Sequence, residues 1–218
     1  MSGAGNFMVQ VSIWAVPTIF AIILHEIMHG FVALQLGDDT ALRAGRLTLN
    51  PISHIDLFGT LVLPGLLLFF NLPVFGYAKP VPVNFGRLRN GRRGMMMVAA
   101  AGPLTNVALA IVSSFAMHAA AGFIGGPMGR EIAWPLYLMF RASVIINIVL
   151  AIFNLFPLLP LDGGRVMVGM LPIPAARVVA RLEPYGFIIL LFLLYTDTVE
   201  RVINPIIMVA ARALGVPL

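Results

Sequence analysis

The sequence contains no cysteine and few charged residues. None of the 218 residues is cysteine, and only 11% are Asp, Glu, Lys or Arg. Without cysteine the chain has no disulfide framework, no thiolate metal site and no catalytic thiol, so any metal must be bound by His, Asp or Glu. With 60% hydrophobic residues and a mean hydropathy of +0.96, the composition excludes an ordinary soluble domain and predicts an integral membrane protein.

Basic residues outnumber acidic ones and give a formal net charge of +5. The one dense basic run, GRLRNGRRG at 86–94, lies between apolar segments, which indicates a membrane-flanking loop and no nucleic-acid partner. The N-terminal MSGAGNFMVQ contains no Lys or Arg and leads into an apolar stretch, so we expect this segment to be retained and not cleaved as a signal peptide. We expect a multi-pass membrane protein, in the plasma (inner) membrane if it is bacterial.

Several apolar windows approach the length of about 20 residues that a membrane-spanning helix needs. They lie at 8–36, 57–75, 95–122, 132–157 and 185–214, and the last is long enough for two segments hinged near 196–201. The loops between the windows are too short for a separate globular domain. The sequence therefore predicts an all-α polytopic membrane helix bundle of about five to six segments, forming one domain over residues 1–218.

The window at 57–75 is the least regular. Pro64 and Gly65 interrupt it, and re-entry would place the basic loops before and after it on the same, cytoplasmic face. We therefore expect residues 57–75 to re-enter the membrane rather than cross it. The stretch AKPVPVN at 78–84 alternates apolar residues with prolines. It is either a short edge strand that accepts a peptide by strand addition or a stiff polyproline-like connector.

The stretch HEIMH at 25–29 matches the pattern H-E-x-x-H inside an apolar segment. On a helix, His25 and His29 lie on one face and can bind one metal ion, while Glu26 lies beside them and can hold a water molecule. A charged residue in the middle of an apolar helix costs about 2.5–3.5 kcal/mol on insertion scales unless it is paired or lines a wet cavity. The pattern therefore predicts a zinc site.

A third zinc ligand is required, because catalytic zinc usually has three protein ligands and one open position. The chain has only nine acidic residues, and Asp162 stands apart from the others. Pro157 and Pro160 must interrupt the helix before it, and Gly163 and Gly164 allow backbone conformations that are closed to other residues. On composition alone, a plain helix-ending turn is the alternative interpretation of this stretch.

Three motifs follow one another along the chain: HEIMH at 25–29, AAAGPLTN at 99–106 and NLFPLLPLDGGR at 154–165. Together they resemble the site-2 protease family of intramembrane zinc metalloproteases. The resemblance covers about two thirds of the chain and rests on two long, specific motifs.

The resemblance implies a role for each matching residue. His25, His29 and Asp162 would bind one Zn²⁺ per chain, and Glu26 would be the catalytic carboxylate. Asn154 matches the asparagine that helps to hold the substrate or the developing oxyanion.

The resemblance also implies an activity. The protein would hydrolyse a peptide bond within or near the transmembrane segment of a membrane protein, as in regulated intramembrane proteolysis, with the lipid bilayer and this substrate as its partners. It would be a compact member without a PDZ or nucleotide-binding regulatory domain. Its catalytic core would cover about 8–170, followed by C-terminal helices at about 175–218.

Two other functions compete with this one. A membrane protease that combines H-E-x-x-H with a distant glutamate, and processes lipidated or other tails, would use Glu131, Glu183 or Glu200 as its third ligand; the motif around Asp162 argues against it. A non-catalytic zinc-binding membrane scaffold would have no need of Glu26 beside its ligands.

Other polar residues lie in apolar surroundings. His54 forms either a cap or interfacial hydrogen bond, or acts as a gate or as support for the zinc ligands. Asn106 and Asn147 are expected to form hydrogen bonds between helices.

Overall fold

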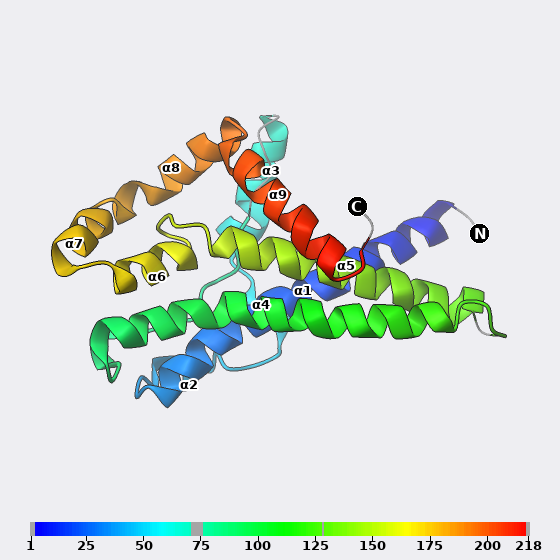
Figure 1. Cartoon of the computed structure of the whole chain (residues 1–218), viewed down its shortest axis with the longest axis horizontal. Coiled ribbons are helices and arrows are strands. Elements are labelled where there is room, and N and C mark those ends of the chain that lie inside the picture. The colour runs from blue at the N-terminus through cyan, green and yellow to red at the C-terminus, as the bar shows by residue number, and fades with distance from the viewer. Residues whose placement is uncertain (1–2, 71–75, 128, 217–218) are drawn as a thin grey trace.

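A computed structural model describes residues 3–70, 76–127 and 129–216 of the chain. All regular elements in these ranges are helical, and no strand occurs within them, which confirms the predicted all-α class. The three longest are α1 (Gly3–Gln35), α4 (Gly91–Gly122) and α5 (Trp134–Asn154) (Figure 1). The shorter α-helices are α2 (Thr40–Arg43), α3 (Leu63–Phe69), α6 (Asp162–Met170), α7 (Ile173–Arg181), α8 (Glu183–Tyr195) and α9 (Thr198–Ala213).

Short non-α turns complete the described part of the chain. Two 3₁₀ turns, η1 (Pro51–His54) and η3 (Phe85–Arg87), lie within the segment that leads from α1 to α4. Two π-helical turns, η2 (Leu57–Val62) and η4 (Gly129–Ala133), continue directly into α3 and α5.

Three helices are long and apolar enough to cross a membrane: Met8–Gln35, Gly91–Gly122 and Glu131–Asn154. They match three of the predicted windows. The pair α7 and α8 adds a fourth span if it is counted as one, although the two helices meet at an angle of 66°. The described residues therefore contain three or four candidate spans, whereas the predicted five to six membrane segments also counted the re-entrant window and two hinged C-terminal segments.

Two windows account for the difference. The window at 57–75 contains only the short apolar helix Leu57–Phe69, and its residues 71–75 lie outside the described part of the chain. The window at 185–214 is broken at Thr196 and Asp197, and Asp197 has a left-handed backbone with φ of 54°. This break confirms the hinge predicted near 196–201. The re-entry of 57–75 stays a prediction.

Helix α4 is the centre of the bundle. It packs against α1, α5 and α6, and α5 also packs against α1 and α9. Figure 1 shows α5 running beside α4 while α1 crosses both. One buried cluster joins α4, α5 and α9 through Ala110, Met117, Val144, Ile148 and Ala211. Because this bundle fixes α1, α4 and α5 relative to one another, it also fixes the polar side chains that they carry inward.

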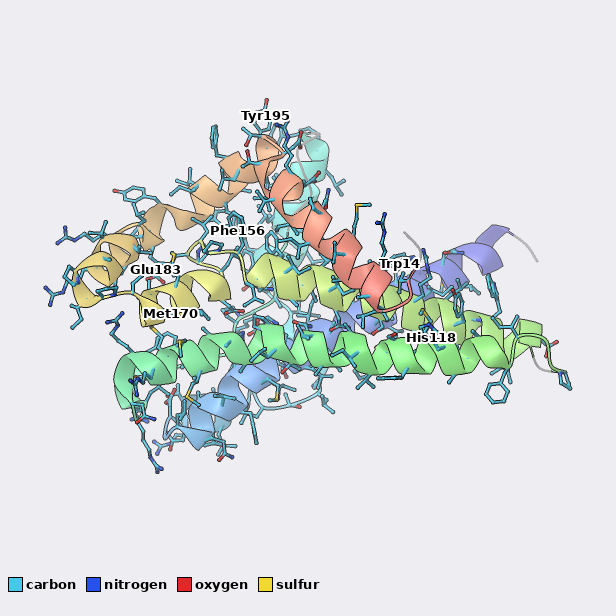
Figure 2. All side chains as sticks on the ribbon, viewed as in Figure 1. Trp14, His118, Phe156, Met170, Glu183 and Tyr195 are labelled. Carbon is cyan, nitrogen blue, oxygen red and sulfur yellow. The ribbon has the colours of Figure 1, made fainter. Side chains whose placement is uncertain are left out.

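The outside of the bundle is apolar. Phe20, Phe115 and Phe192 are exposed on α1, α4 and α8, and Tyr195 at the end of α8 points away from the other helices (Figure 2). Water would penalise so much exposed aromatic surface, whereas the hydrocarbon core of a bilayer solvates it. This surface agrees with the membrane location that the composition predicts.

Candidate metal centre and active site

His25 and His29 project from one face of α1 toward the interior of the bundle. Both residues are buried, and their Nε2 atoms lie 3.0 Å apart. The four-residue spacing places them one helical turn apart, as the H-E-x-x-H pattern predicts.

Asp162 joins the two imidazoles from the start of α6. Its Oδ2 atom lies 3.2 Å from Nε2 of His25 and 3.3 Å from Nε2 of His29. These three residues form the one group in the described ranges whose ligand atoms converge closely enough to hold a metal ion. Asp162 of the third motif thus meets the two histidines of the first motif in space.

The glycines after Asp162 allow α6 to begin so close to the end of α5. A Cβ atom on Gly163 would collide with the carbonyl group of Leu155, and one on Gly164 would collide with the backbone of Leu158 and Leu159. Neither glycine has a positive φ. Their role is therefore close packing of backbone on backbone, and the expected reason, an unusual backbone conformation, is wrong.

Proton positions on the imidazoles follow from the partners of their Nδ1 atoms. Nδ1 of His29 lies 2.7 Å from the main-chain oxygen of Val98, which can only accept a hydrogen bond, so this nitrogen carries the proton. Nδ1 of His25 lies 2.5 Å from Oδ1 of Asn106 and donates to it in the same way. Both Nε2 atoms then direct lone pairs toward Asp162.

Three acceptor atoms therefore face one another with no donor between them. Oδ2 of Asp162 is buried and has no hydrogen-bond partner. A cation satisfies such a site, and two imidazoles with one carboxylate are a common ligand set for catalytic zinc. Ligands about 2.0–2.1 Å from a tetrahedral ion lie about 3.3 Å from one another, close to the 3.0, 3.2 and 3.3 Å that separate these atoms. The residues fit zinc.

Gly102 of α4 leaves room for the ion. A Cβ atom at this position would lie 2.5 Å from Nε2 of His29 and 2.6 Å from Nε2 of His25. Gly102 and Asn106 both belong to the stretch 99–106, four residues apart, and therefore share one face of α4. Gly102 leaves space beside the two imidazoles, and Asn106 accepts a hydrogen bond from Nδ1 of His25.

Glu26 lies beside the three ligands and contacts the segment 78–84. Its Oε2 atom accepts a hydrogen bond of 2.9 Å from the main-chain N–H of Val81. Gly30, one turn further along α1, allows this approach, because a Cβ atom there would lie 2.8 Å from Cγ1 of Val81. The segment pairs with no strand in the described ranges, and further hydrogen bonds fix it at Lys79 and Asn84.

A cavity of about 1360 Å³ opens next to this group. Its wall is mostly apolar, and its polar lining residues are Glu26, the three converging residues, His54, Thr60, Tyr77, Asn154 and Arg165. One side is formed by Ile55, Phe58 and Tyr77, and another by Val149, Leu150, Phe187 and Leu190. The carboxylate of Glu26 and the candidate ligands are thus reached through an apolar chamber.

Asn154 and His54 line the same cavity without joining the metal group. Asn154 is the last residue of α5, and its Nδ2 atom donates to the carbonyl of Leu150 at 3.0 Å. His54 is buried, and its Nε2 atom lies 2.9 Å from the main-chain oxygen of Thr48. The hydrogen-bond interpretation of His54 is therefore present in the structure, while its role as a gate stays a prediction.

The glutamates of the competing protease class lie elsewhere. Glu183, at the junction of α7 and α8 (Figure 2), pairs with Arg165 at 3.3 Å. Glu131 lies in η4, directly before α5, and Glu200 lies in α9. None of these three carboxylates belongs to the converging group in the described residues.

The predicted hydrogen bonds of Asn106 and Asn147 between helices are confirmed, but sequence reasoning did not assign three features of α4 to the site. The carbonyl of Val98, the space at Gly102 and the contact of Asn106 with His25 are contributed by α4. The motif AAAGPLTN carried the signal, because its glycine and asparagine have helical spacing, but nothing local indicates which helix they face.

Comparisons with known proteins agree with this site. The chain matches the model of a family described as Peptidase family M50 over residues 113–195, a range that includes Asn154 and Asp162. It is 36% identical over 195 residues to "Putative zinc metalloprotease YwhC" of Bacillus subtilis (strain 168), covering 88% of this chain and 84% of the relative.

Two mycobacterial relatives are more distant. "Putative zinc metalloprotease Rip2" of Mycobacterium tuberculosis (strain ATCC 25618 / H37Rv) is 28% identical over 198 residues, which cover 90% of this chain and 70% of the relative. Its namesake in Mycolicibacterium smegmatis is 26% identical over 206 residues, which cover 92% and 72%. No solved structure matches the chain at a significant level. With its close similarity to a relative that it covers almost completely, the chain belongs to peptidase family M50, the site-2 protease family, and is a membrane zinc metalloprotease.

Proposed function

We propose that the protein hydrolyses a peptide bond within or near the transmembrane segment of a membrane protein, with one Zn²⁺ held by His25, His29 and Asp162. Membership of the family implies a protein substrate. The observation that carries the finer proposal is the convergence of three buried acceptor atoms beside the carboxylate of Glu26, at an apolar cavity lined in part by membrane-length helices.

Zinc bound there would supply Lewis acidity toward the scissile carbonyl and would lower the pKa of water. Glu26 is the general base. Its carboxylate takes a proton from the attacking water and passes it to the nitrogen of the leaving amine. The hydrogen bond from Val81 to Oε2 holds the carboxylate in place and leaves Oε1 to handle the proton.

The substrate must be unwound before it reacts. A transmembrane helix hides its peptide bonds in its own hydrogen-bond ladder, so cleavage requires that the segment near the scissile bond is extended. The cavity suits such a segment, because its apolar wall accepts the side chains of a membrane protein. Asn154 lines the same cavity, and the second N–H of its amide would donate to a substrate carbonyl or to the developing oxyanion.

A comparison of membrane proteomes tests this function. Cells that produce the Glu26→Gln variant should accumulate one or a few intact membrane proteins that cells with the wild-type protein convert to shorter fragments. Cleavage sites mapped on these fragments should fall within or next to a transmembrane segment. Sites confined to lipidated tails or to soluble domains would contradict the proposal and favour the competing protease class.

A further inference from the structure

A buried polar network lies behind His25, on the side away from the cavity. Asn106 of α4 is completely buried, and Asn147 of α5 is almost completely buried. Nδ2 of Asn106 donates to Oδ1 of Asn147 at 2.8 Å and to the main-chain oxygen of Ala21 at 3.3 Å. The network thus joins α1, α4 and α5 at the level of the first zinc ligand.

The donors and acceptors of this network can be assigned, because a main-chain carbonyl at its end can only accept a hydrogen bond. Nδ2 of Asn147 donates to the main-chain oxygen of Ser143 at 2.9 Å, and a carbonyl oxygen can only accept. Oδ1 of Asn147 is therefore left to accept from Asn106. Since the amide nitrogen of Asn106 is used in this way, its Oδ1 atom faces His25 and must accept from Nδ1 of that imidazole.

The two zinc ligands differ in how they are held. Nδ1 of His29 donates to the main-chain oxygen of Val98, whose orientation the α4 backbone fixes. His25 instead depends on a side-chain amide, and an amide can rotate by half a turn and present its NH₂ group. If the NH₂ group faced Nδ1, the imidazole would carry its proton on Nε2 instead. Nε2 would then have no lone pair for a metal ion. The direction of the Asn106 amide is therefore a requirement for zinc binding by His25.

We propose that Asn147, acting through Asn106, is a positioning residue for the zinc centre: it fixes the direction of the Asn106 amide and so keeps the lone pair of His25 Nε2 directed at the metal. This inference rests on the proposed zinc site. In the described residues Asn147 does not line the cavity and forms no hydrogen bond with Glu26 or Asp162, so its effect on the metal passes through Asn106. Loss of a partner that orients a ligand typically weakens metal binding by about 10- to 100-fold.

The experiment measures zinc affinity of the purified full-length protein in detergent, by competition with a chromophoric chelator. Asn147→Leu keeps the branched shape of asparagine and removes both hydrogen-bonding groups, and Asn147→Ala is a second, smaller variant in case the first does not fold. Ser113→Ala is the matched control. It removes a hydrogen bond of 2.8 Å to Oγ of Ser143 between the same two helices but leaves both acceptors of Asn147 Nδ2, the carbonyl and Oγ of Ser143, in the chain.

We expect Asn147→Leu to weaken zinc binding by about 10- to 100-fold and Ser113→Ala to leave it unchanged, while the melting temperatures of the two zinc-free variants fall by similar amounts. The visible absorption of the cobalt-loaded Asn147→Leu protein should also change. Equal zinc affinities of the two variants would overturn the inference, because the network would then only join helices. If the wild-type protein binds no zinc, the proposed function fails as well; if it binds zinc and only the Asn147 effect is missing, the inference alone fails.

Discussion

The main-chain N–H of Val81 donates a hydrogen bond of 2.9 Å to Oε2 of Glu26. The proposed base is therefore held by the segment 78–84, which lies far from it in sequence and carries no catalytic side chain of its own. The main-chain N–H of Lys79 donates to the main-chain oxygen of His54, the last residue of η1, at 2.9 Å. The segment 78–84 thus connects η1 to the carboxylate of Glu26 through hydrogen bonds.

Removing this N–H should slow cleavage without loss of metal. Val81→Pro lacks the donor, whereas Val81→Ala keeps it and serves as the control. A hydrogen bond to a charged group contributes about 1.5–3 kcal/mol, so we expect cleavage by Val81→Pro to be about 10-fold slower or more than cleavage by Val81→Ala. Zinc content, measured by atomic emission, should be equal in the two variants. Equal cleavage rates would show that Glu26 needs no support from this segment.

A methyl group on Gly102 should block the metal site. In Gly102→Ala the new Cβ atom would lie within 2.6 Å of Nε2 in both His25 and His29. We expect zinc affinity to fall by more than about 100-fold, although alanine is the better helix former. Gly122→Ala, in the same helix and facing open space, is the matched control. Zinc binding by Gly102→Ala at wild-type strength would mean that the ion does not sit between these imidazoles.

Asp162 should prove to be the third ligand. Asp162→Asn keeps the size of the side chain but removes its charge. We expect zinc affinity to fall by at least about 100-fold. Glu183→Gln breaks the pair with Arg165 and should leave zinc affinity unchanged. Chelator competition on both variants measures this. The reverse result, with zinc lost only on substitution of Glu183, would favour the competing protease class.

Asp38, in the loop after α1, should make stability depend on pH. Burial raises the pKa of Asp38. Hydrogen bonds from the side chain of Thr40 and from the main-chain N–H groups of Asn84 and Thr40 together lower it by more, so the pKa lies below its ordinary value. The carboxylate therefore stabilises the folded state above the unfolded pKa of about 4. This contribution is lost as the pH falls through the lower folded pKa.

The corresponding variant is Asp38→Asn. We expect it to be less stable than the wild-type protein by about 2 kcal/mol near neutral pH, and we expect the difference in melting temperature to shrink below pH about 4. Thermal melting of the detergent-solubilised protein across this range measures the effect. A difference that is constant with pH would show that Asp38 is not held as a carboxylate.

Much of this site could be predicted from local sequence. Hydropathy located α1, α4 and α5, and the four-residue spacing of His25 and His29 predicted that they face the same way. Asp162 could be selected because prolines and glycines around it break a helix that would otherwise continue. The prediction of the fold class needed no tertiary information.

The remainder depends on contacts between distant residues. His25 and Asn106 are 81 positions apart, and Glu26 and Val81 are 55 apart, so no local pattern indicates either contact. The hinge predicted near 196–201 could be located locally, because the polar residues there interrupt an apolar window, and the backbone at Asp197 separates α8 from α9.

The most direct test of the account compares wild-type protein with Glu26→Gln in liposomes that contain a substrate identified by the proteomic comparison. Zinc content and cleavage are measured on the same samples. The account predicts about one zinc ion per chain in both proteins, with cleavage in the wild-type protein and none in the variant. Cleavage by Glu26→Gln at the wild-type rate would contradict it.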